Sequence, residues 1–336
     1  MALVQTTSLV QKTVRGALWT TTAGFVSRAV GLVATLIITH FVDPGEYGEV
    51  TVAAVLTMTV NQLSTIGWGQ FLVSRPDAPP SAAFHVTIFH VCLGALALAL
   101  LVLGGNSGLS LWLETPRLMH YLPGLALSSL LDRVAFVPER ILVRDLRFAR
   151  LSAVRMTGDL THSAVSIAAA ALGLGAAAIV AGSVARSTVR LALYVRSVRL
   201  QTWLSPSRLD PKQIRELLAF GVPMSLGGLC EFASRRWDNL LVSRFFGPAT
   251  TGMYNLAYNL ADVPAIQIGE QIGDVLLPSF ARMHLERRRA ALLRSLSLLS
   301  LIVFPLAVGL GAVAPSLVAV IFDPRWQAIG PMLILL

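Results

Sequence analysis

The chain has 336 residues, of which 54% are hydrophobic and only 13% are charged. With a mean hydropathy of +0.68, it is far more apolar than a soluble domain of this length needs to be to fill its core. The net charge of +9 would favour nucleic-acid binding in a soluble protein, but in a membrane protein the positions of the charges decide their meaning. The composition therefore predicts a membrane protein.

Apolar stretches of spanning length follow one another along the chain, separated by short polar or basic breaks. A transmembrane helix needs about 20 mostly apolar residues. We expect such helices at residues 17–41, 47–72, 84–104, 119–138, 156–172, 174–195, 217–243, 250–276 and 295–321, followed by the start of a further one. The first stretch is too long for a removable signal peptide. The predicted fold class is an all-α membrane protein, a polytopic helical bundle.

Lysine and arginine residues gather in every second gap between these stretches. If the amino terminus lies inside the cell, most of the 27 lysine and arginine residues fall in inner segments, whereas the outer segments hold only Arg117, Arg244 and Arg325. An excess of basic residues marks the cytoplasmic loops of membrane proteins. We therefore expect a multi-pass protein of the bacterial inner membrane with a cytoplasmic amino terminus and with no nucleic-acid partner.

The second part of the sequence repeats features of the first part at one constant spacing. The aligned pairs include Gly24 with Gly228, Phe41 with Phe245, Pro44 with Pro248, and Gly69 with Gly273. Parallel repeats related by an axis along the membrane normal are a common transporter plan, with the substrate path between them. We therefore predict an amino-terminal lobe of six transmembrane helices at 1–205 and a cytoplasmic connector at 206–216. Residues 217–336 would hold three helices and the start of a fourth, as the first part of a truncated second lobe.

Three blocks of sequence carry a resemblance to a known family. They are residues 31–48 (GLVATLIITHFVDPGEYG), 138–148 (PERILVRDLRF) and 237–248 (WDNLLVSRFFGP), the last continuing through 252–260 to 277–282. In this order and spacing, the chain resembles the Wzx-type oligosaccharide and polysaccharide flippases, also called lipopolysaccharide biosynthesis proteins. These belong to the multidrug/oligosaccharidyl-lipid/polysaccharide exporter superfamily. The resemblance runs along essentially the whole chain.

The resemblance implies a transporter and not an enzyme. Such a carrier flips undecaprenyl-diphosphate-linked oligosaccharide repeat units across the inner membrane by alternating access, for surface polysaccharide biosynthesis. Its implied partners are this lipid-linked oligosaccharide and membrane lipids, with a polysaccharide polymerase and glycosyltransferases as further candidates. No cofactor is implied.

Arginines inside the predicted helices are the candidate site residues. A charged side chain at the bilayer centre costs roughly 2.5 to 3.5 kcal/mol, a cost that a wet cavity removes. Guanidinium groups also grip diphosphate oxygens in bidentate fashion. The candidates for diphosphate binding are Arg28, Arg133, Arg186, Arg235 and Arg236.

These arginines also allow a structural interpretation. Arg235 is four residues after Glu231, and Arg236 is close to Asp238, so either pair can form an ion pair that fixes helix packing. Arg190 shares a helix face with Arg186 and can snorkel to the inner surface. Both interpretations stay open at this point.

Acidic residues form a second constellation. Asp262, Glu270 and Asp274 are spaced by eight and four residues and so fall on one face of the eighth predicted helix. They could couple transport to a cation or proton, or serve as counter-ions to the arginines. Asp159 with His162, and Asp132 beside Arg133, allow the same two interpretations.

Motifs of other function classes do not occur in the sequence. It has no dinucleotide fingerprint and no phosphate-binding loop, no paired metal-ligand spacing and no nucleophile elbow, so we predict neither catalytic residues nor a metal site. Two alternatives to the flippase remain. A multidrug or cation antiporter of the same superfamily would explain the acidic helix face, and a membrane polysaccharide synthase or ligase would need a larger loop than the sequence offers.

Overall fold

The computed structural model describes Trp19 and residues 22–65, 67–74, 80–207, 211–281 and 285–336. Almost all of these residues are helical, and none of them forms a strand. This confirms the all-α class. The chain divides into two compact units, Met1–Thr251 and Gly252–Leu336, which are described separately. The lobe boundaries expected from the repeat stay a prediction.

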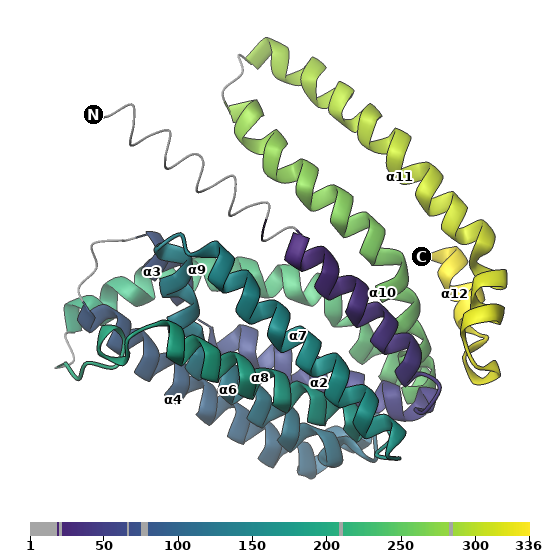
Figure 1. Ribbon diagram of the computed structural model, residues 1–336, viewed down its shortest axis with the longest axis horizontal. Helices are drawn as coiled ribbons and strands as arrows, with labels where there is room; N and C mark the ends of the chain where they lie inside the picture. The colour runs from purple at the N-terminus through teal and green to yellow at the C-terminus, as the bar shows by residue number, and fades with distance from the viewer. Residues whose placement is uncertain (1–18, 20–21, 66, 75–79, 208–210, 282–284) are drawn as a thin grey trace. The chain divides into compact units, whose positions relative to one another are not determined.

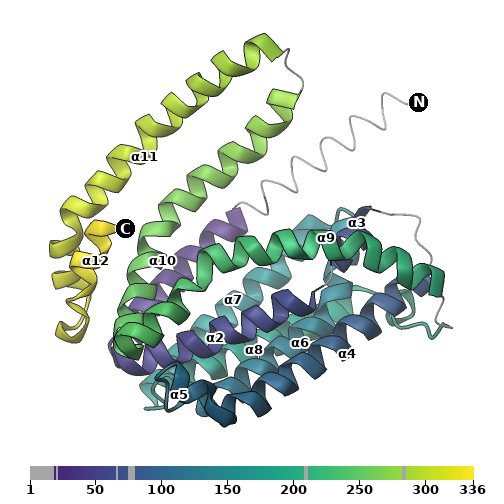
Figure 2. The ribbon, with the colours of Figure 1, turned by 180° about the vertical axis from the view of Figure 1, so that it is seen from behind.

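The first unit is a bundle in which α2, α4, α6, α7 and α8 lie side by side (Figures 1 and 2). Its helices are Thr22–Ile38, α2 (Pro44–Ser64), α3 (Trp68–Ser74), α4 (Pro80–Gly104), α5 (Ser110–Trp112), α6 (Leu118–Arg144), α7 (Phe148–Ala171), α8 (Ala177–Ser197), α9 (Pro211–Arg236) and the start of α10 (Asp238–Ala281). The connection between α7 and α8 is short because Gly173 and Gly175 take positive φ angles of 85° and 54°, which glycine adopts at no steric cost.

Two boundaries differ from those expected from the sequence. The span expected at 47–72 is broken into α2 and α3 near Gly67, whose φ is 47°. The gap expected between 243 and 250 is instead a kink at Gly247 (φ 79°, ψ 171°) inside α10, and the helix break lies at Trp237. The break at Gly67 and the kink at Gly247 both lie at glycines with positive φ, where the backbone can turn without an apolar stretch ending.

The core of the first unit consists of two apolar clusters at opposite ends of the bundle. Along α6, the residues of one cluster run from Leu118 to Leu125 and those of the other from Ala135 to Leu142. On α8, the last buried residue of the first cluster is Val180, and the first buried residue of the second cluster is Tyr194. The middle of each of these helices is therefore left to polar side chains.

The second unit contains the remainder of α10, α11 (Leu285–Ile321), a 3₁₀ turn (Pro324–Trp326) and α12 (Ile329–Leu335). The chain turns after α11 so that α12 folds back against it (Figure 2). Among the described residues, three helices are long and apolar enough to cross a membrane by length and composition, namely Ser81–Gly104, Ala177–Ser197 and Arg289–Ile321. A shorter apolar helix spans Thr22–Ile38.

Candidate functional site

A belt of polar side chains crosses the first unit at mid-height, between its two apolar clusters. We call this set the polar belt: Ser128, Asp132 and Arg133 on α6; Asp159, His162, Ser163 and Ser166 on α7; Ser183, Arg186, Ser187 and Arg190 on α8. All five serines are at most 7% exposed. Because polar groups are costly in an apolar surrounding unless they are paired, the partners of each charged group indicate its role.

Arg190 is held by an ion pair between α8 and α7. Its Nη2 lies 2.6 Å from Oδ1 of Asp159, and both side chains are less than one third exposed. It therefore bonds across the bundle to α7, whereas the sequence had also allowed it to snorkel. This ion pair links α7 to α8 at the level of the polar belt.

Arg186 shares that side of α8 and lies in the field of two carboxylates. Asp132 on α6 and Asp159 on α7 both act on it electrostatically, while its Nε is buried and has no hydrogen-bond partner. The structure thus brings Arg186 and Arg190 together, as their spacing predicted. Two arginines face two aspartates, an arrangement typical of a charge-balanced packing network.

Glycines and serines let α6, α7 and α8 approach closely around these charges. A Cβ at Gly158 would lie 2.6 Å from the side chain of Arg190, and a Cβ at Gly182 would lie 1.9 Å from Oγ of Ser166. On α6, the hydroxyl of Ser128 meets Oγ of Ser187 at 2.9 Å. Small residues at helix contacts are the usual packing device inside membranes.

Arg133 is buried, at 3% exposure, in a pocket between α2, α4 and α6. Its Nε donates to Oδ1 of Asn61 at 2.8 Å, and one Nη donates to the carbonyl of His90 at 2.9 Å. The other Nη donates to the hydroxyl of Ser64. We call this set the Arg133 pocket. All these acceptors are neutral, so the guanidinium is held by hydrogen bonds and not by an ion pair.

Gly94 on α4 makes room for this guanidinium. A Cβ at that position would lie 2.2 Å from the Nε, Cζ and Nη1 atoms of Arg133. The sequence signals that could have revealed the pocket are Asn61 and Ser64, three residues apart on α2, and Gly94 within an apolar helix. As placed, Arg133 donates to protein acceptors, and α2 would have to move before a ligand could reach it.

Arg28 and Arg235 are placed in the opposite way, on exposed faces of the first unit. Arg28 forms no ion pair or hydrogen bond with the residues that the structure describes. Arg235 makes the expected contact with Glu231, at 3.5 Å, but the two side chains are 48% and 70% exposed. Arg236 is half-exposed at the end of α9. These three arginines present guanidinium groups that a ligand can contact.

The acidic face predicted for the eighth helix falls on α10. Asp262 is half-buried in the second unit. The side chains of Glu270 and Asp274 lie outside the described residues. Near Asp262, the amide of Asn259 donates to Oδ1 of Asn255 at 2.9 Å. No group of three metal-ligating side chains occurs within the described part of the chain.

One end of the first unit is fastened by Glu46, a residue that the sequence analysis did not single out. It lies in the first turn of α2, pairs with Arg117 at the start of α6, and accepts a hydrogen bond at 3.3 Å from the backbone N–H of Ala176 at the start of α8. The hydrogen bond to Glu46 raises the pKa of Arg117. In the sequence, this role was indicated only by the position of Glu46 in the first turn of a helix, where a negative charge interacts favourably with the helix dipole.

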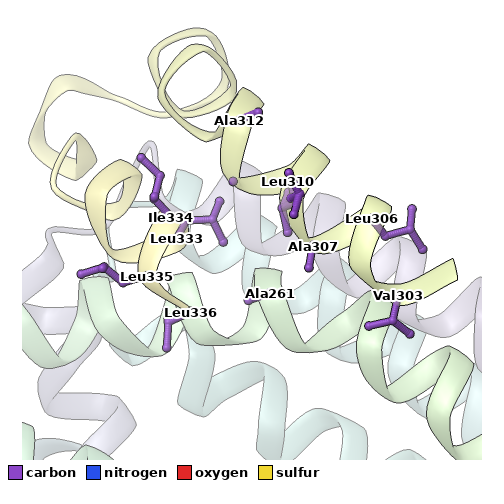
Figure 3. Close-up of a pocket in the computed structure, with 12 residues that line it drawn as sticks. Ala261, Val303, Leu306, Ala307, Leu310, Ala312, Leu333, Ile334, Leu335 and Leu336 are labelled. Atoms are coloured by element: carbon purple, nitrogen blue, oxygen red, sulfur yellow. The ribbon is translucent and has the colours of Figure 1, made fainter. Parts of the chain in front are cut away.

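The second unit contains an apolar pocket of about 530 Å³ (Figure 3). It lies between α11 and α12, with Ala261 of α10 on its wall. Every lining residue is aliphatic or glycine. With no polar or charged side chain on its wall, this pocket suits hydrocarbon and is unsuited to a diphosphate.

Comparison with known proteins agrees with the resemblance seen in the sequence. The family described as "Polysaccharide biosynthesis protein" matches residues 37–331. The chain is 25% identical to the lipopolysaccharide biosynthesis protein WzxC of Escherichia coli (strain K12), over 98% of this chain and 67% of that protein. It is 22% identical to the teichuronic acid biosynthesis protein TuaB of Bacillus subtilis (strain 168), over 97% and 68%.

Two further matches add to this. The chain is 24% identical to the succinoglycan biosynthesis transport protein ExoT of Rhizobium meliloti (strain 1021), over 89% of this chain and 60% of that protein. Its fold resembles that of a multidrug resistance MATE family transporter of the MOP superfamily solved in an inward-facing conformation. That match has a TM-score of 0.68 and 14% identity, and it covers 90% of this chain and 75% of the other. The chain thus spans about two thirds of the length of these curated relatives.

Proposed function

Because the chain belongs to the polysaccharide biosynthesis protein family, we propose that it is a polysaccharide export transporter of the bacterial inner membrane. Its cargo is an undecaprenyl-diphosphate-linked oligosaccharide repeat unit, which it flips to the outer leaflet by alternating access. The curated relatives named for lipopolysaccharide, teichuronic acid and succinoglycan biosynthesis support the cargo class. The MATE-like fold supports the transport plan.

The observation that carries this proposal is the exposure of Arg28 and Arg235 on helices of the first unit. Exposed arginines at bilayer depth are tolerated where they face water or an anionic ligand, and their planar fork matches diphosphate oxygens. We assign the diphosphate contacts to Arg28, Arg235 and Arg236. This assignment leaves out two of the five arginines expected from the sequence. Arg133 is held by neutral acceptors, and Arg186 faces two aspartates.

The proposed orientation places the amino terminus in the cytoplasm. It follows from the excess of basic residues in alternate loops. On this assignment, the end of the bundle that carries Glu46 and Arg117 is periplasmic, and the end at the α6–α7 turn is cytoplasmic. Polymerase and glycosyltransferase partners would then meet the carrier on opposite sides of the membrane.

The energy source is proposed to act through the acids of α10. Asp262, Glu270 and Asp274 would bind a proton or cation, since acids inside membrane proteins commonly serve as relays. Replacing Asp262 by Asn should reduce transport and weaken its dependence on a proton or sodium gradient. Unaltered gradient dependence in that variant would remove Asp262 from the coupling.

The decisive experiment is deletion of the gene that encodes the full-length protein, in a strain without a redundant flippase. Lipid-linked repeat units should accumulate on the cytoplasmic leaflet, as measured by mass spectrometry and by their protection from an externally added glycosidase, and surface polysaccharide should be lost. Normal surface polysaccharide would contradict the proposal. Efflux of cationic dyes by the purified protein in vesicles would instead favour the antiporter.

Point variants of the complementing gene test the arginine assignment. Arg28→Gln and Arg235→Gln should each lower surface polysaccharide by about tenfold or more, because each removes a charge-assisted bond to phosphate. Arg244→Gln is the control, since Arg244 is a partly exposed arginine of the same unit that is paired with Glu114 at 3.0 Å and lies outside the proposed diphosphate set. All variants should reach the membrane in equal amounts. Full complementation by both test variants would remove the phosphate role.

A further inference from the structure

A second group of arginines lies at one end of the first unit, outside the polar belt. The group comprises Arg144, Arg147 and Arg150, where α6 passes into α7, and Arg196 and Arg199, where α8 ends. Contacts to one residue bring the two segments together. Arg147 donates from Nη1 to the carbonyl of Ser197 at 3.3 Å, and Arg150 donates from Nε to its hydroxyl at 3.0 Å. We call this set the basic end surface.

Most of the charge on the basic end surface is not neutralised by the protein. Arg144 is paired with Asp145, with its Nε 3.2 Å from Oδ1. The other four arginines form no ion pair with any residue that the structure describes. Arg147 and Arg150 each donate one hydrogen bond to Ser197, while a guanidinium carries five N–H donors. Most of their donors therefore remain available for an anion.

The opposite end of the same bundle is different. There Arg117 is paired with Glu46, and Arg244 is paired with Glu114 at 3.0 Å. Both arginines on that side thus have a carboxylate of the protein as partner. Of the two ends of the bundle that the structure describes, it is therefore the basic end surface that carries arginines without a carboxylate partner.

Exposed leucines accompany these charges. Leu146 is 42% exposed, Leu200 51% and Leu204 38%. The segment that carries the last two is anchored by Trp203, which is 1% exposed and belongs to the same apolar cluster as Leu142. A fixed surface that alternates leucine with arginine is typical of a contact with the boundary between lipid headgroups and acyl chains.

We propose that the basic end surface is a binding site for the phosphate headgroup of an anionic phospholipid. The arginines hold the phosphate by charge-assisted hydrogen bonds, and the exposed leucines pack against the first acyl methylenes. The site does not depend on oligosaccharide flipping. Only its assignment to the cytoplasmic leaflet rests on the orientation proposed above, and that leaflet is the one whose anionic lipids attract basic segments near the membrane.

The test is lipid retention by the purified full-length protein. The protein is reconstituted with equal amounts of dioleoylphosphatidylglycerol and dioleoylphosphatidylcholine, re-extracted in detergent, and its bound lipids are counted by native mass spectrometry. The wild type should retain phosphatidylglycerol. A variant with Arg147, Arg150, Arg196 and Arg199 all replaced by Gln should retain at least about tenfold less. The control carries Arg117→Gln with Arg244→Gln at the opposite end and should behave as the wild type.

The proposal would be overturned by equal retention of the two lipids by the wild type, or by undiminished retention of phosphatidylglycerol by the fourfold variant. If that variant fails to fold, the wild type at high salt replaces it, since 1 M salt shortens the screening length to about 3 Å and should release the lipid. Added undecaprenyl diphosphate should not displace phosphatidylglycerol. Displacement would assign the arginines to the transported substrate and overturn the lipid assignment.

Discussion

Arg133 in its pocket and Arg235 on α9 have opposite surroundings: the first is buried and the second is exposed. In the pocket, Asn61, Ser64 and the carbonyl of His90 accept hydrogen bonds from a guanidinium that is 3% exposed. Arg235 has one weak contact to Glu231 and is about half exposed. An arginine within an apolar helix is therefore not by itself a sign of a ligand site. The unused donors are what distinguish a binding arginine from a packing one.

The largest effect that would break this comparison is the loss of Arg133. In Arg133→Met, two buried acceptors and the half-buried Asn61 lose their donor. Each unsatisfied group costs about 1 to 3 kcal/mol, so the free energy of unfolding should fall by about 3 kcal/mol. The measurement is thermal and denaturant unfolding of the purified protein in detergent. Arg28→Met is the matched control and should leave the unfolding midpoint unchanged. A stable Arg133→Met protein would show that the pocket is not a packing device.

A smaller effect is expected from filling the space that Gly94 leaves. In Gly94→Ala, the new methyl group would meet the Arg133 guanidinium at 2.2 Å, and the forced shift should cost about 1 to 3 kcal/mol. Gly31→Ala is the control, because a Cβ there has no neighbour within 4 Å. Alanine at a helical glycine normally stabilises by roughly 0.5 to 1 kcal/mol. Equal unfolding midpoints for the two variants would contradict the close contact.

The smallest change in stability is expected when the exposed ion pair Arg235–Glu231 is broken, in comparison with the partly buried pair Arg190–Asp159. Asp159→Asn leaves Arg190 partly buried without its carboxylate and should destabilise the first unit by about 2 kcal/mol, between the values for exposed and buried pairs. Glu231→Gln breaks the exposed pair with Arg235 and should change stability by only a few tenths of a kcal/mol. Both are read from unfolding midpoints in detergent. If Glu231→Gln proved the more harmful, Arg235 would have to be regarded as a packing residue.

The order of the helices could be predicted from the sequence because apolar stretches of spanning length are a local property. The start of α2 after Asp43 and the basic turn between α6 and α7 also appear in the sequence as written. The break at Gly67 could not be located in this way. There Gly67 packs closely against α9, since a Cβ on Gly67 would lie 2.7 Å from the Cα of Gly221, a residue far along the chain.

Parts of the site were equally accessible from the sequence. Arg186 and Arg190 were placed on one face by their spacing alone, and Glu231 was expected beside Arg235 for the same reason, because helical neighbours lie three or four residues apart. The partner of Arg190 could not be predicted from spacing in this way, since Asp159 lies on another helix. Periodicity says which side chains share a helix face but not which helix covers that face.

What the sequence by itself determined is a set of membrane helices, their order, the family and the list of charged residues within them. Only the tertiary structure decided which of those charges are already satisfied. Arg133 and Arg28 were given the same role from the sequence, since both are arginines inside predicted membrane helices. They differ because Asn61, Ser64 and His90 come from two other helices to bond one of them, and such contacts depend on how the helices pack in three dimensions.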